Sequence, residues 1–160
     1  MSQPLKSSSI RVQEFLASHG HNFTVTELAD STRTAKDAAN AIGCTESQIA
    51  KSLIFKDSNT EKAVLIIASG SNQVSVKKVE AAINVKLEKA NANFVRGKTG
   101  FAIGGVPPVA HTDSVLTIID KDLKQYDRIW AAAGTPNSVF ELKAHDLDTL
   151  TGGTWLDIAK

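Results

Sequence analysis

The sequence predicts an α+β fold: one domain in which helices pack around a mixed, mostly antiparallel β-sheet. Short segments with helix and strand patterns follow one another without the regular strand–helix–strand alternation of a parallel α/β protein. Residues 63–68, Ala-Val-Leu-Ile-Ile-Ala, are apolar throughout, as in a central strand covered on both faces. The 160 residues, 42% apolar and 22% charged, suit one domain with a full core. We therefore expect residues 1–160 to form a single domain, with residues 1–8 as a flexible terminus.

The first helix is expected to start at Ser9, a candidate N-cap, and to end near His19, with Gly20 as its stop. Its core-facing side chains should be Ile10, Phe15 and Leu16. A short strand over residues 22–26 should follow.

A second helix should begin after Thr34, whose hydroxyl can cap it, and end at Gly43. Its apolar residues form a narrow stripe of mostly small side chains: Ala35, Ala38, Ala39 and Ile42. Such a stripe permits close packing on a sheet, and it could also form the floor of a ligand pocket. Thr45 and Gln48 have capping-box spacing, so a further helical turn should precede the next strand.

Strands over residues 51–55 and 63–68 should pair as a hairpin, because the segment between them is polar. Lys51 begins the first strand, where a lysine commonly covers apolar surface with its stem and keeps its charge in water. The remaining elements expected from caps and apolar patterns are helices over 75–83, 91–97 and 144–150, strands over 85–87, 115–119, 129–133 and 139–142, and a helical turn over 122–126.

Positive charge is concentrated between residues 77 and 98, where six lysine and arginine residues face two glutamates. This excess is either a solvated helix face or the electrostatic footprint of an RNA end. The net charge of the whole chain is only +1, which argues against a long grip on nucleic acid but leaves contact with one end open.

The most distinctive stretch is residues 98–111, Lys-Thr-Gly-Phe-Ala-Ile-Gly-Gly-Val-Pro-Pro-Val-Ala-His. Gly104 and Gly105 free the backbone, and Pro107 and Pro108 stiffen it directly afterwards. Taken alone, this pattern is either a tight turn between strands or a shaped loop that presents its amides to a negatively charged group.

Several kinds of chemistry have no support in the sequence. Cys44 is the single cysteine, its setting suits a small residue at a helix end, and no Cys/His cluster has zinc-ligand spacing, so neither a metal nor another cofactor is expected. There is no Gly-x-Ser-x-Gly elbow, P-loop or dinucleotide fingerprint. Lys51 and a loop of backbone amides remain, which suit an electrophile that is already activated, such as an ester. Without a membrane-spanning run or a secretory signal, we expect a cytoplasmic protein with no membrane partner.

Three separated segments of the sequence resemble segments of one known protein family. They are residues 34–39 with 42–43 and 48–55, residues 99–108, and residues 132–137 with 140–142 and 146–147. In order and spacing they resemble the YbaK/ProX family of aminoacyl-tRNA deacylases, from about Thr34 to the C-terminus. The resemblance implies a barrel-like sheet surrounded by helices. It also implies a trans-editing activity that hydrolyses the ester of wrongly charged tRNA, with tRNA for proline as the first carrier to test.

The resemblance also implies roles for individual residues. Lys51 would hold the terminal nucleotide, and the backbone of Gly104 and Gly105 would stabilise the reacting carbonyl, with Ser52 as a weaker polar contact. Attack would come from water or from the substrate itself. Some branches carry a histidine near Pro136 and Asn137, and this sequence has none there.

The expected pocket wall is apolar, which favours a small, uncharged amino acid such as alanine, cysteine, serine or 2-aminobutyrate. Its residues are Ala35, Ala38, Ala39, Phe101, Ile103 and Val106. The implied partners are the 3′ acceptor end of an aminoacyl-tRNA and, as a further candidate, an aminoacyl-tRNA synthetase. Two alternatives stay open: a non-catalytic module that binds tRNA ends or a synthetase, and a hydrolase of an unrelated small activated ester.

Overall fold

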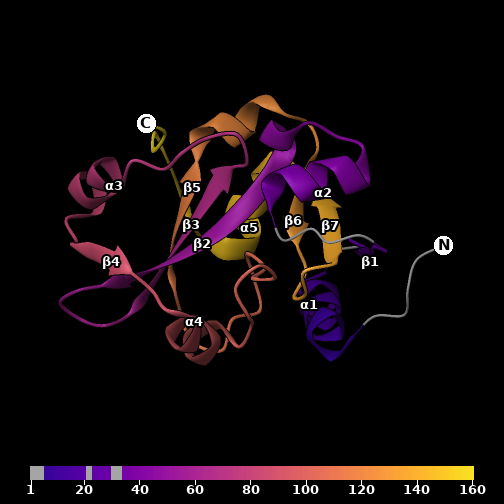
Figure 1. Cartoon of the computed structure of the whole chain (residues 1–160), viewed down its shortest axis with the longest axis horizontal. Helices are drawn as coiled ribbons and strands as arrows, with labels where there is room; N and C mark the ends of the chain where they lie inside the picture. The colour runs from indigo at the N-terminus through magenta and orange to yellow at the C-terminus, as the bar shows by residue number, and fades with distance from the viewer. Residues whose placement is uncertain (1–5, 21–22, 30–33) are drawn as a thin grey trace.

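The computed structural model describes residues 6–20, 23–29 and 34–160, and Figure 1 shows helices around one sheet. The helices are α1 (Ser7–Ser18), α2 (Ala35–Ile42), α3 (Val76–Ile83), α4 (Ala92–Thr99) and α5 (Ala144–Thr151), with 3₁₀ turns η1 (Glu46–Gln48) and η2 (Lys121–Gln125). The strands are β1 (Val25–Glu27), β2 (Ile49–Asp57), β3 (Ala63–Ser69), β4 (Leu87–Lys89), β5 (Leu116–Asp120), β6 (Ile129–Ala132), β7 (Ser138–Leu142) and β8 (Thr154–Leu156).

The eight strands form one mixed sheet in the order β1-β7-β6-β2-β3-β5-β8, with β4 paired to β2. Four strand pairs are antiparallel and three are parallel. The prediction of an α+β fold with a mixed, mostly antiparallel sheet is therefore confirmed. The sheet does not close into a barrel, because β1 and β8 lie at its two ends and do not pair with each other within the described chain.

Strand β3 is central, as its apolar sequence predicts. It pairs with β2 on one edge and β5 on the other, and all seven of its residues are buried. Leu65 and Ile67 pack in the main core with Leu147 of α5, whereas Val64 and Ile66 pack with Val79 of α3. Alternate residues thus serve opposite faces, each covered by helices.

Local signals placed the second helix and the following turn correctly. Thr34 Oγ1 accepts a hydrogen bond from the Asp37 N–H (3.0 Å), and Gly43 ends α2 in the left-handed region at φ 88°. The Thr45 N–H donates to Gln48 Oε1 (3.0 Å), which completes the capping box at η1. These contacts fix the direction in which β2 leaves α2.

Four expectations about the elements were wrong or incomplete. Helix α1 begins at Ser7, so Ser9 lies inside it and donates a hydrogen bond to Ser138 Oγ (2.8 Å) instead of capping. This frame leaves Ile10 43% exposed and buries Val12 with Leu16. Helix α4 continues past residue 97 and ends at Thr99, and β8 forms a strand that was not predicted. Residue 22 of the expected first strand lies outside the described residues.

Among the described residues, no helix is both long and apolar enough to cross a membrane.

Candidate active site

A break in the pairing along one edge of β2 locates the site. Strand β3 pairs with residues 50–56 of β2 along one edge. The other edge pairs with β6 only at Ile49 and Ala50, and with β4 only at residues 55–57. Residues 51–54 therefore have no strand partner on this edge within the described chain. A cavity of about 470 Å³ lies beside this unpaired stretch.

The cavity wall combines segments that are far apart in the sequence. The start of α2, the turn η1, the unpaired part of β2, the glycine loop and the β6–β7 hairpin all contribute. Of the residues expected at the site, the following line it: Ala35, Ala38, Lys51, Ser52, Ile103, Gly104 and Val106. The β6–β7 hairpin faces the glycine loop, and the Gly134 N–H donates to the Gly105 carbonyl (2.9 Å).

Lys51 holds its charge at the cavity rather than in bulk water. Its Nζ donates to the carbonyl oxygens of Asn72 (2.7 Å) and Gly70 (3.4 Å), both in the turn that follows β3. Burial lowers the pKa of Lys51, and the negative charges of Glu46 and Asp120 oppose that shift. An ammonium has three N–H donors, so one is left for a ligand.

Ser52 presents an unused polar atom. Its Oγ is buried and has no hydrogen-bond partner within the described chain. Because a buried hydroxyl without a partner costs about 1–3 kcal/mol, such an atom is a natural contact for a polar group of a ligand. Both Ser52 and Lys51 line the cavity, although successive side chains of a strand point to opposite faces of the sheet, Lys51 beside Ala68 and Ser52 beside Ile67 of β3.

The two glycines of the loop have different tasks. Gly104 has φ 95°, a conformation that glycine adopts without strain, and it lines the cavity. Gly105 docks the loop: its N–H donates to the Ala102 carbonyl (3.1 Å), and a Cβ there would lie 2.8 Å from backbone atoms of Thr135. The Gly105 amide is therefore already engaged. The N–H groups of Gly104 and Val106 have no hydrogen-bond partner in the described part of the chain.

Phe101 does not line the cavity, although it was expected in the wall. It is 2% exposed and belongs to the main core, with the Arg11 guanidinium 4.6 Å from its ring centroid. Arg11 also donates to the Ala110 carbonyl (2.8 Å), and the Phe101 N–H donates to Thr99 Oγ1 (3.1 Å). A large ring on a loop thus supports the loop from beneath. Ile103, two residues on, is 55% exposed at the cavity.

Several lining residues were missed in the sequence, among them Lys36, Glu46, Gly70 and Trp130. Gly70 follows an apolar strand, which signals a turn, but the need for glycine there comes from packing. A Cβ on Gly70 would collide with the Glu46 carbonyl oxygen and lie 2.8 Å from the Ala35 Cβ. Trp130 carries no local signal that separates a pocket wall from a core position.

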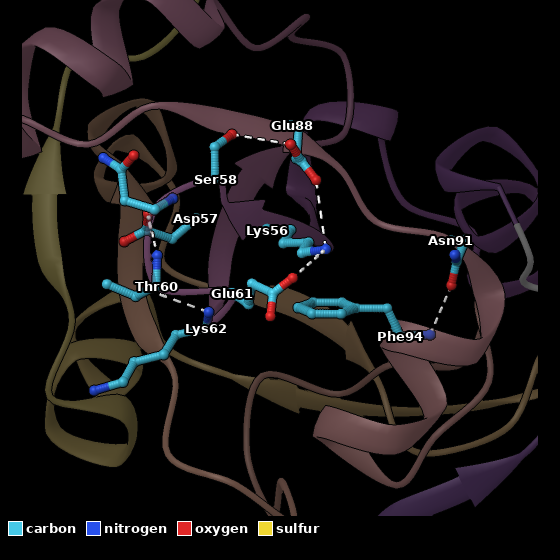
Figure 2. Close-up of polar contacts among 10 residues, drawn as sticks. Lys56, Asp57, Ser58, Thr60, Glu61, Lys62, Glu88, Asn91 and Phe94 are labelled. Atoms are coloured by element: carbon cyan, nitrogen blue, oxygen red, sulfur yellow. Dashed lines mark hydrogen bonds and ion pairs between the residues drawn. The ribbon is translucent and has the colours of Figure 1, made fainter.

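The second lysine of β2, Lys56, contrasts with Lys51. Figure 2 shows its Nζ between Glu61 and Glu88, at 3.4 and 3.5 Å, beside the Phe94 ring. The hydrogen bond to Glu61 is the main reason that the pKa of Lys56 is raised. Lys56 does not line the cavity. The same strand thus carries one lysine that is paired with carboxylates and one that is held at a pocket by carbonyls.

Neither Cys44 nor a histidine of the described residues lines the cavity. Burial raises the pKa of the Cys44 thiol, which disfavours the reactive thiolate. Within the described chain, no three His, Cys, Asp or Glu side chains gather as they would to hold a metal ion. The cavity therefore combines apolar side chains with the charged groups of Lys36, Glu46 and Lys51 and with the backbone of the glycine loop.

Comparison with known proteins agrees with this arrangement. Residues 29–150 match the aminoacyl-tRNA editing domain. The chain belongs to that family. The matched range contains β2, the turn after β3 and the glycine loop, so every residue that lines the cavity lies within the editing domain. The family-level resemblance seen in the sequence is confirmed.

Three relatives of this editing domain are informative. The uncharacterized protein YwhH of Bacillus subtilis (strain 168) is 33% identical over 137 residues, 85% of this chain and 87% of that protein. A proline–tRNA ligase of Thermoanaerobacter sp. (strain X514) is 27% identical over 94 residues, 58% of this chain but only 16% of the ligase. A solved structure of a proposed trans-editing enzyme for prolyl tRNA synthetase has a TM-score of 0.92 at 40% identity, covering 98% of this chain and 99% of that one.

Proposed function

We propose that this editing domain is a trans-editing deacylase, which hydrolyses the ester between a tRNA and a small, uncharged, wrongly attached amino acid. The observation that carries the proposal is that Lys51, Ser52 and Gly104, from β2 and the glycine loop, all line one cavity beside the unpaired edge of β2. Two of the relatives are tied by name to prolyl-tRNA synthesis, so tRNA for proline is the first carrier to test.

Binding comes first in the proposed mechanism. The free N–H of the Lys51 ammonium donates to a phosphate or ribose oxygen of the terminal nucleotide, while its other donors stay on the Gly70 and Asn72 carbonyls. The aminoacyl group enters the cavity, whose volume of about 470 Å³ is in the range of small-ligand sites. Ser52 Oγ gains a polar partner there.

The chemical step needs no protein nucleophile. Water attacks the ester carbonyl carbon and gives up a proton, and the negative charge that develops on the carbonyl oxygen is stabilised by loop amides. Gly104 and Val106 supply these N–H groups, because the Gly105 N–H is bound to Ala102. The bond to the ribose oxygen then breaks, that oxygen takes a proton, and the amino acid leaves.

The apolar part of the cavity wall sets the preference for one amino acid over another. Apolar side chains of α2 and the glycine loop, among them Ala35, Ala38 and Val106, face the aminoacyl group. Since a pocket separates side chains that differ by one methylene by about 1–3 kcal/mol, a synthetase for a mid-sized amino acid also charges smaller ones. A separate, narrower pocket corrects that error.

A deacylation screen tests the proposal. The purified protein is incubated with tRNAs that carry correct and incorrect amino acids, and free amino acid is measured over time. We expect release of small uncharged groups, first alanine, cysteine, serine or 2-aminobutyrate on tRNA for proline. Binding of tRNA without release from any of them would instead identify a non-catalytic module. Equal hydrolysis of simple activated esters without tRNA would identify a general esterase.

A further inference from the structure

We propose that Asp120, acting through Asn72, is a positioning residue that fixes the location and the charge of the Lys51 ammonium. This inference rests on the proposed function, because it assigns a role within the same site. Asp120 ends β5, two strands away from Lys51, and does not line the cavity. Its influence therefore reaches the substrate only through its neighbours.

The Asp120 carboxylate is buried and collects three N–H donors. Asp120 is only 1% exposed. Oδ2 accepts from the Ser69 N–H (3.0 Å) and from Asn72 Nδ2 (2.9 Å), and Oδ1 accepts from the Asp122 N–H (3.0 Å). Burial of an ionised carboxylate is costly unless it is well paired, so these contacts hold the chain around it firmly.

Two of the donors belong to the turn that holds Lys51. Ser69 opens this turn and Asn72 closes it, with the Asn72 N–H bound to the Ser69 carbonyl (2.9 Å). The Asn72 carbonyl is the nearer partner of Lys51 Nζ, at 2.7 Å. Asp120 thus accepts a hydrogen bond from the Asn72 side chain, while the Asn72 main-chain carbonyl accepts one from the Lys51 ammonium. A shift of Asn72 would move Lys51 directly.

The charge of Asp120 also acts on the Lys51 ammonium. The acidic groups whose charge acts on Lys51 are Glu46 of η1 and Asp120 of β5, and both favour its protonated form. Two other charged groups lie nearby. Asp122 of η2 also accepts a hydrogen bond from Asn72 Nδ2 (2.8 Å). Lys36 of α2 lines the same cavity as Lys51. Asp120 is therefore the carboxylate that both tethers the turn and favours the charged state of Lys51.

Asp120→Asn is the decisive variant, because it keeps the shape and removes the charge, and Asp122→Asn is its matched control. The pKa of Lys51 is measured in the free protein by following the ¹³Cε shift of its side chain with pH. Turnover is measured on the best charged tRNA. We expect Asp120→Asn to lower the pKa of Lys51, to move the alkaline limb of the rate profile to lower pH, and to reduce turnover about tenfold, as for loss of one hydrogen bond to a charged group. Asp122→Asn should leave the pKa of Lys51 close to its parental value.

Parental values of the Lys51 pKa and of turnover in Asp120→Asn would overturn the inference. So would a loss of turnover with an unchanged pKa of Lys51, or an equal drop in pKa in Asp122→Asn. If Asp120→Asn does not fold, Asn72→Ala severs the tether at its other end and should reduce turnover by a similar factor, and parental turnover in that variant would refute the link. An inactive parent would refute the proposed function, and the titration of Lys51 would still decide this inference.

Discussion

Replacing Gly105 by alanine should disturb the active loop through one identifiable contact. The new Cβ would lie 2.8 Å from Cα and C of Thr135, whereas ordinary contacts of a Cβ lie at 3.4–4 Å. The loop and the β6–β7 turn must therefore separate by roughly 0.6 Å or more, which strains the hydrogen bond between the Gly134 N–H and the Gly105 carbonyl. Overpacking of this kind costs about 1–3 kcal/mol in the free energy of unfolding.

Activity should suffer more than stability. The neighbouring amides of Gly104 and Val106 would be displaced with the loop, and a misplacement near 1 Å costs about a hundredfold in rate. Urea unfolding gives the stability, and single-turnover deacylation gives the rate. Gly97→Ala is the matched control, because a Cβ on Gly97 meets nothing within 4 Å. A stable Gly105→Ala protein with parental turnover would refute the assignment of the loop to the reacting carbonyl.

Three further predictions concern the cavity and the loop. Lys51→Arg should lower turnover by about tenfold or more in the deacylation assay, because a planar guanidinium cannot replace a compact ammonium held between two carbonyls; parental turnover would show that any cation suffices. Ser52→Ala should leave stability unchanged or slightly higher, since the Oγ has no partner in the described chain, and should raise KM; lower stability with parental KM would contradict a role in binding. Burial, aided by Arg11, lowers the pKa of His111, so the unfolded chain binds more protons and stability should fall as pH drops below about 6.5, by at most about 1.4 kcal/mol per pH unit. Urea unfolding at several pH values should show that His111→Gln removes part of this dependence, and identical pH profiles of parent and variant would contradict it.

Local sequence signals were sufficient for most of the fold. The two ends of α2 could be predicted from Thr34 and Gly43, because capping and the left-handed stop depend on a few neighbouring residues. The apolar run of β3 implied cover on both faces for the same reason, since strand periodicity is a local property. The start of α1 was misplaced because Ser9 suits a cap by composition, but its hydroxyl bonds to Ser138, far away in the sequence.

The parts of the site that depend on long-range pairing could not be predicted. The unpaired edge of β2 exists only because β6 and β4 pair with different ends of the same strand. The tether from Asp120 to Asn72 joins residues 48 positions apart, and neither residue belongs to a recognisable motif. An aromatic residue beside a glycine loop suits either a pocket wall or the core, so the sequence alone could not place Phe101, which is 2% exposed and packs in the main core.

The most direct test of the proposed function compares two alanine variants of the same strand in deacylation of one wrongly charged tRNA. Both variants lose a lysine from β2. Lys51 lines the cavity, whereas Lys56 does not line it. Lys56 is instead paired with Glu61 and Glu88 (Figure 2). Lys51→Ala should remain folded and lose about tenfold to a hundredfold in turnover, as expected for removal of a charged hydrogen-bond donor from the substrate. Lys56→Ala should retain nearly parental turnover. Parental turnover in a folded Lys51→Ala protein would contradict the account of how this editing domain works.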